Sequence, residues 1–358
     1  MFPVLIDKLQ RRVDLTVDEA AGAMGTIMDG SAQPSQIAGF LVGLAMKGER
    51  PDEIVGLART MRARSTKLSR SFAPVFDTCG TGGDGAHTFN VSTVAALVLA
   101  ACGVRVAKHG NRSASSRCGS ADLFEELGVN LTAQPPIVER CLDEAGIAFL
   151  FAQVFHPSMR HAAQTRKELG VRTAFNLLGP LTNPAGASRQ LVGVPKPELT
   201  ELVARSLAQL GAERAWVVHG ADGLDEISTT GYTKVSECRD GAVNTFYLHP
   251  ADVGLPKSAP GSLRGGDASD NAAIARAILA GEAGAPRDIV LLNAGASLLI
   301  AGQVATIPEG LARAAAAIDS GRAAGVLDRL IAVSQDGASA SGATRSAGAS
   351  RESGKEQS

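Results

Sequence analysis

Hydrophobic residues recur with helical spacing through roughly the first seventy positions of the chain. Thr16 to Glu19 has the form of a capping box, and it precedes an apolar-periodic run that ends near Gly30. Two further runs cover residues 35–47, closed by a glycine, and residues 51–65, opened by a proline. This pattern predicts an N-terminal region made of helices alone.

From Val75 onward, short apolar runs typical of strands alternate with helical segments. The elements we predict are helices over 92–102 (with Asn90 or Ser92 as N-cap and Gly103 as the stop) and 122–127, strands over 104–107, 215–218 and 289–292, and a hairpin turn at Asp240-Gly241. Alternation of this kind predicts an α/β fold with a central mixed, mainly parallel sheet covered by helices.

The change of pattern also predicts domain boundaries. We expect a small helical domain over 1–72, completed by about residues 165–190, which again read as helix and loop. We expect a larger α/β domain over 73–164 and 191–333, entered through the linker Ala73-Pro74. Residues 334–358 are rich in serine, glycine and alanine with scattered charges, and this composition predicts a disordered tail.

Composition narrows the class of protein. The chain has 358 residues, 45% of them hydrophobic, with a formal net charge of −1, which is typical of a soluble globular protein without a global attraction to nucleic acid or anionic membrane. No apolar run approaches a bilayer span, and the charged N-terminus argues against a signal peptide, so we expect a cytoplasmic location. Five cysteines without C-x-x-C spacing argue against a structural zinc site.

Two polar loops between residues 77 and 119 flank one apolar helix and one short strand. The first loop carries four glycines, Gly80, Gly82, Gly83 and Gly85. Glycines let backbone N–H groups approach phosphate oxygens closely, and the helix that follows offers further free N–H groups and the positive end of its dipole. The first loop therefore favours a phosphate ligand.

The second loop supplies cations and hydroxyls. It carries Lys108, His109, Asn111, Arg112, Ser113, Ser115 and Ser116. It follows a predicted strand, and ligands of open α/β sheets bind at the carboxyl ends of strands, so both loops should face one crevice. Together they predict a site for a highly phosphorylated small molecule.

Two better-known phosphate motifs fit less well. Residues 80–85 match G-x-G-x-x-G, but a dinucleotide fold needs an acidic residue about twenty positions on, and residues 104–108 are basic there. A Walker A loop needs Lys-Ser or Lys-Thr directly after the second glycine, and none is present.

An acidic segment at residues 222–226 follows the predicted strand 215–218. Adjacent carboxylates also suit an ordinary solvated turn, but beside a phosphate site they suit Mg²⁺, which takes hard oxygen ligands from one or two carboxylates and from substrate phosphates. Asp225, Glu226 and the hydroxyl of Ser92 form a candidate set for Mg²⁺ with pyrophosphate.

Residues 156–184 hold several cations, Arg160, Arg166, Lys167 and Arg172. Most suit a solvated helix face. One of them could meet a substrate carboxylate in the crevice, and the residue pattern leaves open which one.

At these motifs the chain resembles the anthranilate phosphoribosyltransferases of tryptophan biosynthesis. The motifs are GTGGD at 80–84, NVST at 90–93, KHGNRSASS at 108–116, GSAD at 119–122, RKELGVRTAFNLLGPLTNP at 166–184 and DGLDE at 222–226. The resemblance covers about residues 3–333. It implies a small helical domain hinged to a larger α/β domain that binds the phosphoribosyl group, in a homodimer that forms through the helical part.

The resemblance also implies roles for individual residues. Mg²⁺ would bind Ser92, Asp225 and Glu226, and no residue would act as a covalent nucleophile. Anthranilate would meet Gly80, Asn111 and Arg166, with His109 nearby. The sugar diphosphate PRPP would meet Gly80, Gly83, Asp84, Thr88, Asn90, Val91, Ser92, Thr93, Lys108, His109, Gly110, Asn111, Arg112, Ser113, Ala114, Ser115, Ser116 and Ser120. One departure is Tyr232, which stands where the family suggests proline and follows the acidic segment.

Two rival functions remain to be weighed. A pyrimidine nucleoside phosphorylase uses one inorganic phosphate and no metal pair, so Asp225-Glu226 and Asn111 argue against it. A non-catalytic relative that binds nucleic acid should lack motif residues and carry a basic face, whereas this chain has the motifs and a net charge of −1. The partners we predict are PRPP and anthranilate, with neither nucleic acid nor membrane.

Overall fold

A computed structural model describes residues 1–83, 85–113 and 117–348, with side chains as far as residue 336. The predicted ligands Asp84, Ala114, Ser115 and Ser116 lie outside the described residues, as does the end of the chain.

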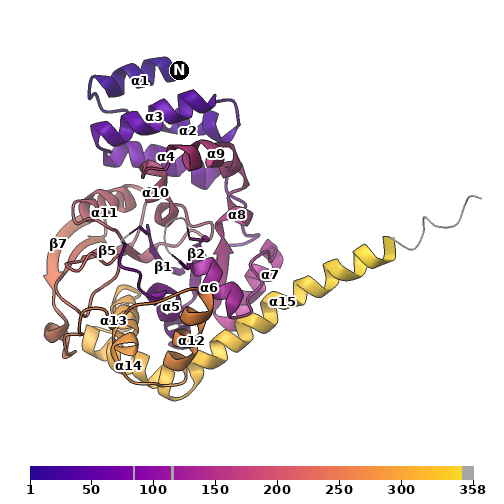
Figure 1. Cartoon of the computed structure of the whole chain (residues 1–358), viewed down its shortest axis with the longest axis vertical. Coiled ribbons are helices and arrows are strands. Elements are labelled where there is room, and N and C mark those ends of the chain that lie inside the picture. Colours follow the sequence, from indigo (N-terminus) through magenta and orange to yellow (C-terminus); the bar gives the residue numbers. More distant parts are fainter. Residues whose placement is uncertain (84, 114–116, 349–358) are drawn as a thin grey trace, which may run out of the picture.

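The first part of the chain consists of four helices, α1 (Phe2–Gln10), α2 (Val17–Met28), α3 (Pro34–Lys47) and α4 (Pro51–Ala63). They stack at one end of the molecule (Figure 1). The predicted capping box opens α2: Thr16 Oγ1 accepts the N–H of Glu19 at 3.2 Å, and the Glu19 carboxylate accepts the N–H of Thr16 at 3.0 Å.

A seven-stranded sheet forms the centre of the larger part. The strands are β1 (Phe76–Gly80), β2 (Val106–Gly110), β3 (Ile147–Phe151), β4 (Arg189–Gly193), β5 (Arg214–Gly220), β6 (Thr233–Arg239) and β7 (Ala242–Leu248). Their order is β3-β2-β1-β4-β5-β6-β7, and β1 to β5 are parallel while β6 and β7 are antiparallel. The predicted fold class, with its mixed and mainly parallel sheet, is confirmed.

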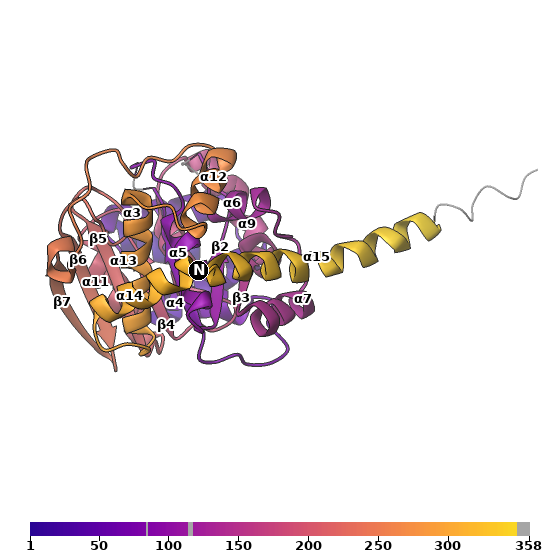
Figure 2. The ribbon, with the colours of Figure 1, turned by 90° about the horizontal axis from the view of Figure 1, so that it is seen from below.

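Helices cover both faces of this sheet. The helices that follow β1 in the chain are α5 (Val91–Ala101), α6 (Ser120–Glu126), α7 (Pro135–Arg140), α8 (Ala152–Phe155), α9 (Arg160–Leu169), α10 (Ala174–Leu178), α11 (Leu199–Gln209), α12 (Ala268–Leu279), α13 (Ala285–Ile300), α14 (Ile307–Asp319) and α15 (Arg322–Gly348). On one face α5 and α13 pack against the strands, with α14 beside them (Figure 2). On the other face α11 and the N-terminal helices share one buried cluster with the strands.

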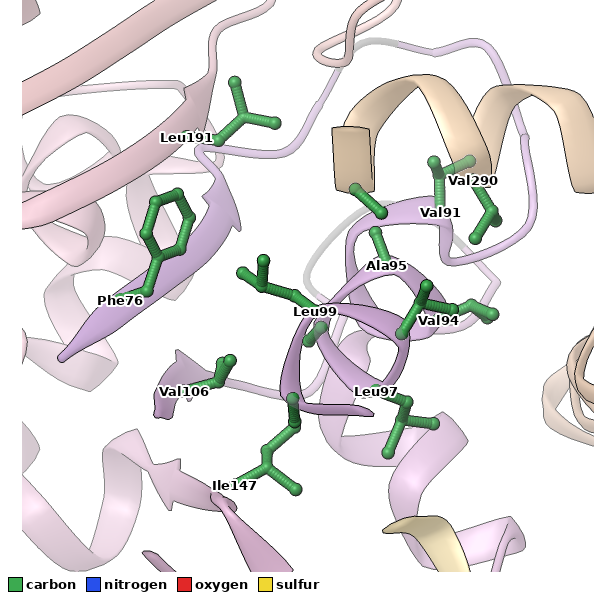
Figure 3. Close-up of a cluster of buried hydrophobic side chains, with 14 of the residues drawn as sticks. Phe76, Val91, Val94, Ala95, Leu97, Leu99, Val106, Ile147, Leu191 and Val290 are labelled. Atoms are coloured by element: carbon green, nitrogen blue, oxygen red, sulfur yellow. The ribbon is translucent and has the colours of Figure 1, made fainter. Parts of the chain in front are cut away.

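The alternation of side chains along the strands explains these two faces. In β4, Leu191 belongs to the cluster on the α5 face and Val192 to the cluster on the α11 face. Figure 3 shows the first cluster, in which Phe76 and Val106 of the sheet meet Leu99 of α5. Burial of α5 on nearly all sides fixes its first turn at the carboxyl end of β1.

Three sequence-based predictions need correction or adjustment. Residues 289–292, predicted as a strand, lie inside α13, where all four are buried. A helix that is apolar all round loses the 3.6-residue contrast that separates it from a buried strand. The strand predicted over 104–107 lies at Val106–Gly110 instead, so Lys108 and His109 end a strand and do not lie in a loop.

The tail also differs from its prediction of disorder from residue 334. Helix α15 continues to Gly348 and extends away from the rest of the fold in both overall views (Figures 1 and 2). Its first half is anchored by Leu330 and Val333, and Ser334 Oγ accepts the N–H of Asn130 at 3.1 Å.

Residues 165–190 contact the N-terminal helices, as predicted. Helix α9 packs on α2 and α3, α10 packs on α3 and α4, and Phe175 and Leu178 share a buried cluster with Leu41 and Ile54. This packing suits a helical domain with a second segment, and the division of the chain into domains stays a prediction.

The predicted hairpin turn is present between β6 and β7, with Asp240 at φ 50° and Gly241 at φ 81°. Within the described residues, no helix is both long and apolar enough to cross a bilayer.

Candidate functional site

The site forms where the order of the parallel strands reverses. Strand β1 pairs with β2 on one side and with β4 on the other, although β4 comes later in the chain. Gly80, Gly110 and Gly193 end these three strands at one edge of the sheet. Open α/β sheets bind ligands at such a switch point, outside the carboxyl ends of the strands.

The glycine-rich loop has the backbone that its sequence predicts. Gly82, Gly83 and Gly85 have φ angles of 65°, 77° and 69°, a region in which a side chain is strained. Thr88 forms an isolated antiparallel bridge with Arg264 at the far end of the loop. The loop thus presents main-chain groups at the edge of the sheet.

The first turn of α5 follows this loop. Asn90 is the N-cap residue, but its side chain donates to the carbonyl of Cys118 at 3.0 Å and accepts from the Asn271 amide at 3.0 Å. The N–H groups at the start of α5 are therefore not capped by Asn90. Val91 and Thr93 are buried, while Ser92 is half-buried beside the acidic segment.

Lys108 is a buried cation at the end of β2. Only 1% of the residue is exposed, and its ammonium group donates to the carbonyl of Thr78 and to Ser92 Oγ, the latter at 3.3 Å. Burial lowers the pKa of Lys108, and nearby Asp77 opposes that shift. The Lys108 ammonium group therefore lies beside the first turn of α5, where it would contact a bound anion.

A buried polar network fixes the two strand ends to each other. Asp77 accepts the N–H of His109 at 3.1 Å and the amide of Asn183 at 2.8 Å, and Asn183 also donates to the carbonyl of Ala107 at 2.7 Å. Burial raises the pKa of Asp77 to about 6, although Lys108 and these donors favour its charged form.

His109 and His156 form a buried pair with ring centroids 5.1 Å apart. His109 Nδ1 bonds to the carbonyl of Gly179 at 3.0 Å, and His156 Nε2 bonds to that of Thr182 at 3.1 Å. Burial lowers the pKa of His109 to about 4 and that of His156 to about 3. Both rings are therefore neutral near pH 7.

The turn after β2 lies within the second polar loop that the sequence predicts. A Cβ on Gly110 would lie 2.2 Å from Ser120 Oγ, so this position needs glycine. Asn111 is exposed, and the N–H of Ser113 donates to the Asp122 carboxylate at 3.1 Å. Arg112, predicted as a ligand, forms ion pairs with Asp122 and with Glu125 at 2.9 and 2.6 Å.

The two predicted metal acids lie against the glycine-rich loop and α5. Asp225 Oδ2 accepts the N–H of Gly82 at 3.0 Å, and Glu226 Oε1 accepts the N–H of Ser92 at 3.1 Å. Asp225 thus lies against the glycine-rich loop, and Glu226 lies at the first turn of α5, which also carries the Ser92 hydroxyl. These hard oxygen ligands fit Mg²⁺, which completes its six positions with water and substrate phosphate oxygens.

Sequence reasoning missed residues that make this arrangement possible. A Cβ on Gly193 would lie 1.5 Å from the carbonyl oxygen of Asp225, so the end of β4 must be glycine for the acidic segment to approach. Asp222 accepts from the side chains of Ser228 and Thr230 and closes the turn. The sequence carried a signal only for Asp222, which belongs to the DGLDE motif.

The cations at residues 160–172 separate into different roles. Arg166 on α9 is half-buried, lies 5.1 Å from the ring centroid of Phe175, and has a pKa lowered by burial. Among the described residues, no hydrogen bond or ion pair joins it to Gly80, His109 or Asn111. Arg172 instead reaches the glycine-rich loop: it donates to the carbonyl of Thr81 at 3.3 Å, and a Cβ on Gly83 would overlap it.

Comparison with known families defines the class of this protein. The family described as "Glycosyl transferase family, a/b domain" matches residues 73–324, and "Glycosyl transferase family, helical bundle domain" matches residues 3–65. The chain is therefore a glycosyl transferase built from a helical bundle and an α/β part.

Individual relatives narrow this class. The anthranilate phosphoribosyltransferase of Moorella thermoacetica is 56% identical over 93% of this chain and 98% of its own length. The crystal structure of the Thermus thermophilus enzyme of the same name is 46% identical, with a TM-score of 0.86 over 92% of this chain and 99% of that one. The chain belongs to the anthranilate phosphoribosyltransferase family, which confirms the predicted resemblance.

A more distant relative has been solved with ligands. The Saccharomyces cerevisiae enzyme in complex with PRPP and Mg is 27% identical, with a TM-score of 0.84 over 94% of this chain and 98% of that chain. The same enzyme has also been solved in complex with 4-fluoroanthranilate.

Proposed function

We propose that this chain transfers the 5-phosphoribosyl group of PRPP to the amine of anthranilate, giving N-(5-phosphoribosyl)anthranilate and pyrophosphate in tryptophan biosynthesis. The observation that carries this function is the meeting of three features at the β1–β4 switch point. They are the glycine-rich loop, the buried Lys108 and the pair Asp225-Glu226. Membership of the family supports the same reaction.

PRPP would bind across the edge of the sheet between the two polar loops. Its phosphate oxygens would accept from the N–H groups of the glycine-rich loop and of the first turn of α5. Lys108 would place a positive charge beneath them, and the turn at 110–120 would close the other side. A yeast relative solved with PRPP and Mg supports this ligand.

Mg²⁺ would be held by Asp225, Glu226 and Ser92, where it would offset negative charge on the pyrophosphate as the bond to ribose C1 breaks. The contacts of these residues suit this role, because both carboxylates already lie within hydrogen-bonding distance of the loop and helix that would hold the diphosphate.

Anthranilate would lie beside ribose C1, in contact with Gly80 and Asn111 and near His109, with its carboxylate directed to Arg166. The half-buried guanidinium of Arg166 suits this task, since burial strengthens a charge-assisted hydrogen bond. A family relative solved with 4-fluoroanthranilate supports an aryl amine ligand.

The chemistry needs no covalent enzyme intermediate. The amine of anthranilate is already neutral at pH 7, so the demanding step is the loss of pyrophosphate from ribose C1. We infer a dissociative displacement with inversion, in which main-chain N–H groups and Lys108 stabilise the charge that develops on the leaving group. A water molecule or a weak base would suffice to take the proton from the amine.

The helical part would carry a homodimer interface, and the enzyme would act in the cytoplasm. Val4 on α1 is 63% exposed and Met46 on α3 is 78% exposed, so an interface on these helices would bury apolar side chains. Sedimentation of the purified protein tests this assembly: a monomer at micromolar concentration would reject it.

The reaction is tested by following anthranilate fluorescence. Purified protein mixed with PRPP, Mg²⁺ and anthranilate should cause a steady loss of anthranilate fluorescence and release pyrophosphate. A parallel trial with thymidine and inorganic phosphate should give no product. Turnover of thymidine with no loss of anthranilate would favour the nucleoside phosphorylase and reject the proposal.

A further inference from the structure

Asn293 is a fully buried polar residue on α13, a helix that packs against β4 and β5. Its side-chain Oδ1 accepts the backbone N–H of Ile227 at 3.0 Å, and its Nδ2 donates to the backbone carbonyl of Ile227 at 2.9 Å. Nδ2 also donates to the carbonyl of Ile289 at 2.9 Å, one turn earlier in α13. One amide thus bonds to both backbone polar groups of Ile227.

Ile227 links this contact to the acidic segment. Ile227 directly follows Glu226 in the chain and is itself fully buried. Because the peptide unit is planar, fixing the N–H and C=O of Ile227 also fixes the end of the peptide that begins at Glu226. The direction of the Glu226 side chain therefore depends on Asn293.

The rest of the acidic segment is held from the other side by its own turn. Asp222 Oδ1 accepts the N–H of Leu224 at 3.3 Å, and Asp222 Oδ2 accepts from Ser228 Oγ at 2.6 Å. Asp222 is exposed, so these bonds compete with water. The contact with Asn293 is dry, and a buried hydrogen bond in a dry site is costly to break because both partners stay unpaired.

We propose that Asn293 is a positioning residue for the magnesium-binding pair Asp225-Glu226. It touches neither metal nor substrate. It aligns the backbone from which Glu226 reaches the first turn of α5, where its carboxylate accepts the N–H of Ser92 at 3.1 Å. This inference rests on the proposed metal site, and its test separates the two.

The test compares Asn293→Leu with Ser297→Ala. Leucine has the same branching and number of side-chain heavy atoms as asparagine but offers no hydrogen bond to Ile227. Ser297 lies one turn further along α13, is fully buried, and has an Oγ without a hydrogen-bond partner among the described residues, which makes it a matched control.

Calorimetric titration of Mg²⁺ into protein saturated with PRPP should give a dissociation constant about tenfold higher for Asn293→Leu, because loss of a residue that orients metal ligands typically weakens metal binding by about 10–100-fold. Ser297→Ala should match the parent protein. A folded Asn293→Leu protein with parental Mg²⁺ affinity would overturn the inference.

Two further variants keep the result decisive. Asp225→Asn removes a proposed metal ligand. If neither Asp225→Asn nor Asn293→Leu changes the Mg²⁺ affinity, the proposed metal site is wrong. If Asp225→Asn weakens Mg²⁺ binding and Asn293→Leu does not, only the role of Asn293 is rejected. If Asn293→Leu does not fold, Asn293→Asp keeps the shape and the acceptor for the Ile227 N–H while removing a donor. It should weaken Mg²⁺ binding by a smaller factor, and parental affinity in this variant would also overturn the inference.

Discussion

The two halves of the candidate site are built differently. The strand-borne half comprises the ends of β1, β2 and β4 with residues 222–230. Its polar groups are paired inside the protein: Lys108 donates to the carbonyl of Thr78, and Asp77 accepts from His109 and Asn183. The loop-borne half comprises the described residues 81–83, 85–88, 111–113 and 117–120, among which Gly82, Gly85 and Asn111 are exposed to solvent.

This difference indicates which part of the site controls turnover and which part controls ligand binding. A buried, paired group holds its place before the ligand arrives, and preorganised charge of this kind stabilises a transition state without reorganisation. Exposed loop residues, in contrast, are in contact with water until a ligand displaces it. We therefore expect changes in the strand-borne half to affect both stability and turnover, and changes elsewhere to affect binding alone.

Gly193→Ala should have the largest effect. The new Cβ would overlap the carbonyl oxygen of Asp225, so the acidic segment must move away from the sheet. We expect kcat to fall at least a hundredfold and the free energy of unfolding to fall by about 1–3 kcal/mol, as in other overpacked sites. Gly231→Ala is the matched control, since its Cβ would have only a contact of 3.9 Å. Near-parental turnover of Gly193→Ala would contradict the importance of this contact.

His156→Gln should change how stability depends on pH. In the folded parent His156 stays neutral to about pH 3, whereas the unfolded chain takes up a proton below about pH 6.5. Acid therefore favours unfolding, and stability is lost as pH falls from 6.5 towards 3.

At pH 5 this one group should cost the parent about 2 kcal/mol relative to pH 7.5. Glutamine cannot take up that proton, and Asp77, whose raised pKa acts in the opposite direction, is present in both proteins. Urea unfolding at both pH values should thus show the gap between parent and variant shrinking by about 2 kcal/mol in acid. An equal gap at both values would mean that His156 is not held neutral.

Arg166→Ala tests the part of the site outside the sheet. Loss of a charge-assisted hydrogen bond to the substrate carboxylate, of about 1.5–3 kcal/mol, should raise the KM for anthranilate roughly ten- to a hundredfold. The KM for PRPP and the melting temperature should change little. Lys167→Ala, on the exposed side of the same helix, is the control. A change confined to PRPP would remove Arg166 from the anthranilate site.

Truncation after Asp336 should have the smallest effect. It keeps the anchored half of α15 and the ion pair between Asp336 and Arg140, and it removes the part of the helix that extends away from the fold. Activity and melting temperature should stay near those of the full chain. A large drop in either would show that the removed segment docks on the enzyme.

Much of this architecture could be predicted from the sequence, because its signals are local. The capping box at Thr16, the turn at Asp240-Gly241 and the glycine-rich loop each need particular residue types at neighbouring positions. The strand that precedes the pair Asp225-Glu226 was predicted from its apolar run, whereas the strand beside Lys108 ends three residues later than predicted. Helix α13 was misread because burial on all sides removes its periodicity.

Contacts between segments that are far apart in the chain could not be predicted from the sequence. The close approach of Gly193 to Asp225 and the bonds of Asn293 to Ile227 join residues 32 and 66 positions apart, and neither Gly193 nor Asn293 stands in a motif. Arg112 is a similar case: its pattern suggested a free phosphate ligand, and the fold pairs it with two carboxylates.

The contact between Gly193 and Asp225 has a consequence for how the acidic segment can move. The backbone of Gly193 lies against the backbone of Asp225, with no flexible side chain between the two. A movement of the acidic segment towards the sheet is therefore blocked by the end of β4, whereas Arg166 stands on α9, which packs on α2 and α3 instead of the strands. The proposed pyrophosphate anchor and the proposed anthranilate contact would therefore rest on different layers of the molecule, one on the sheet and one on the helices.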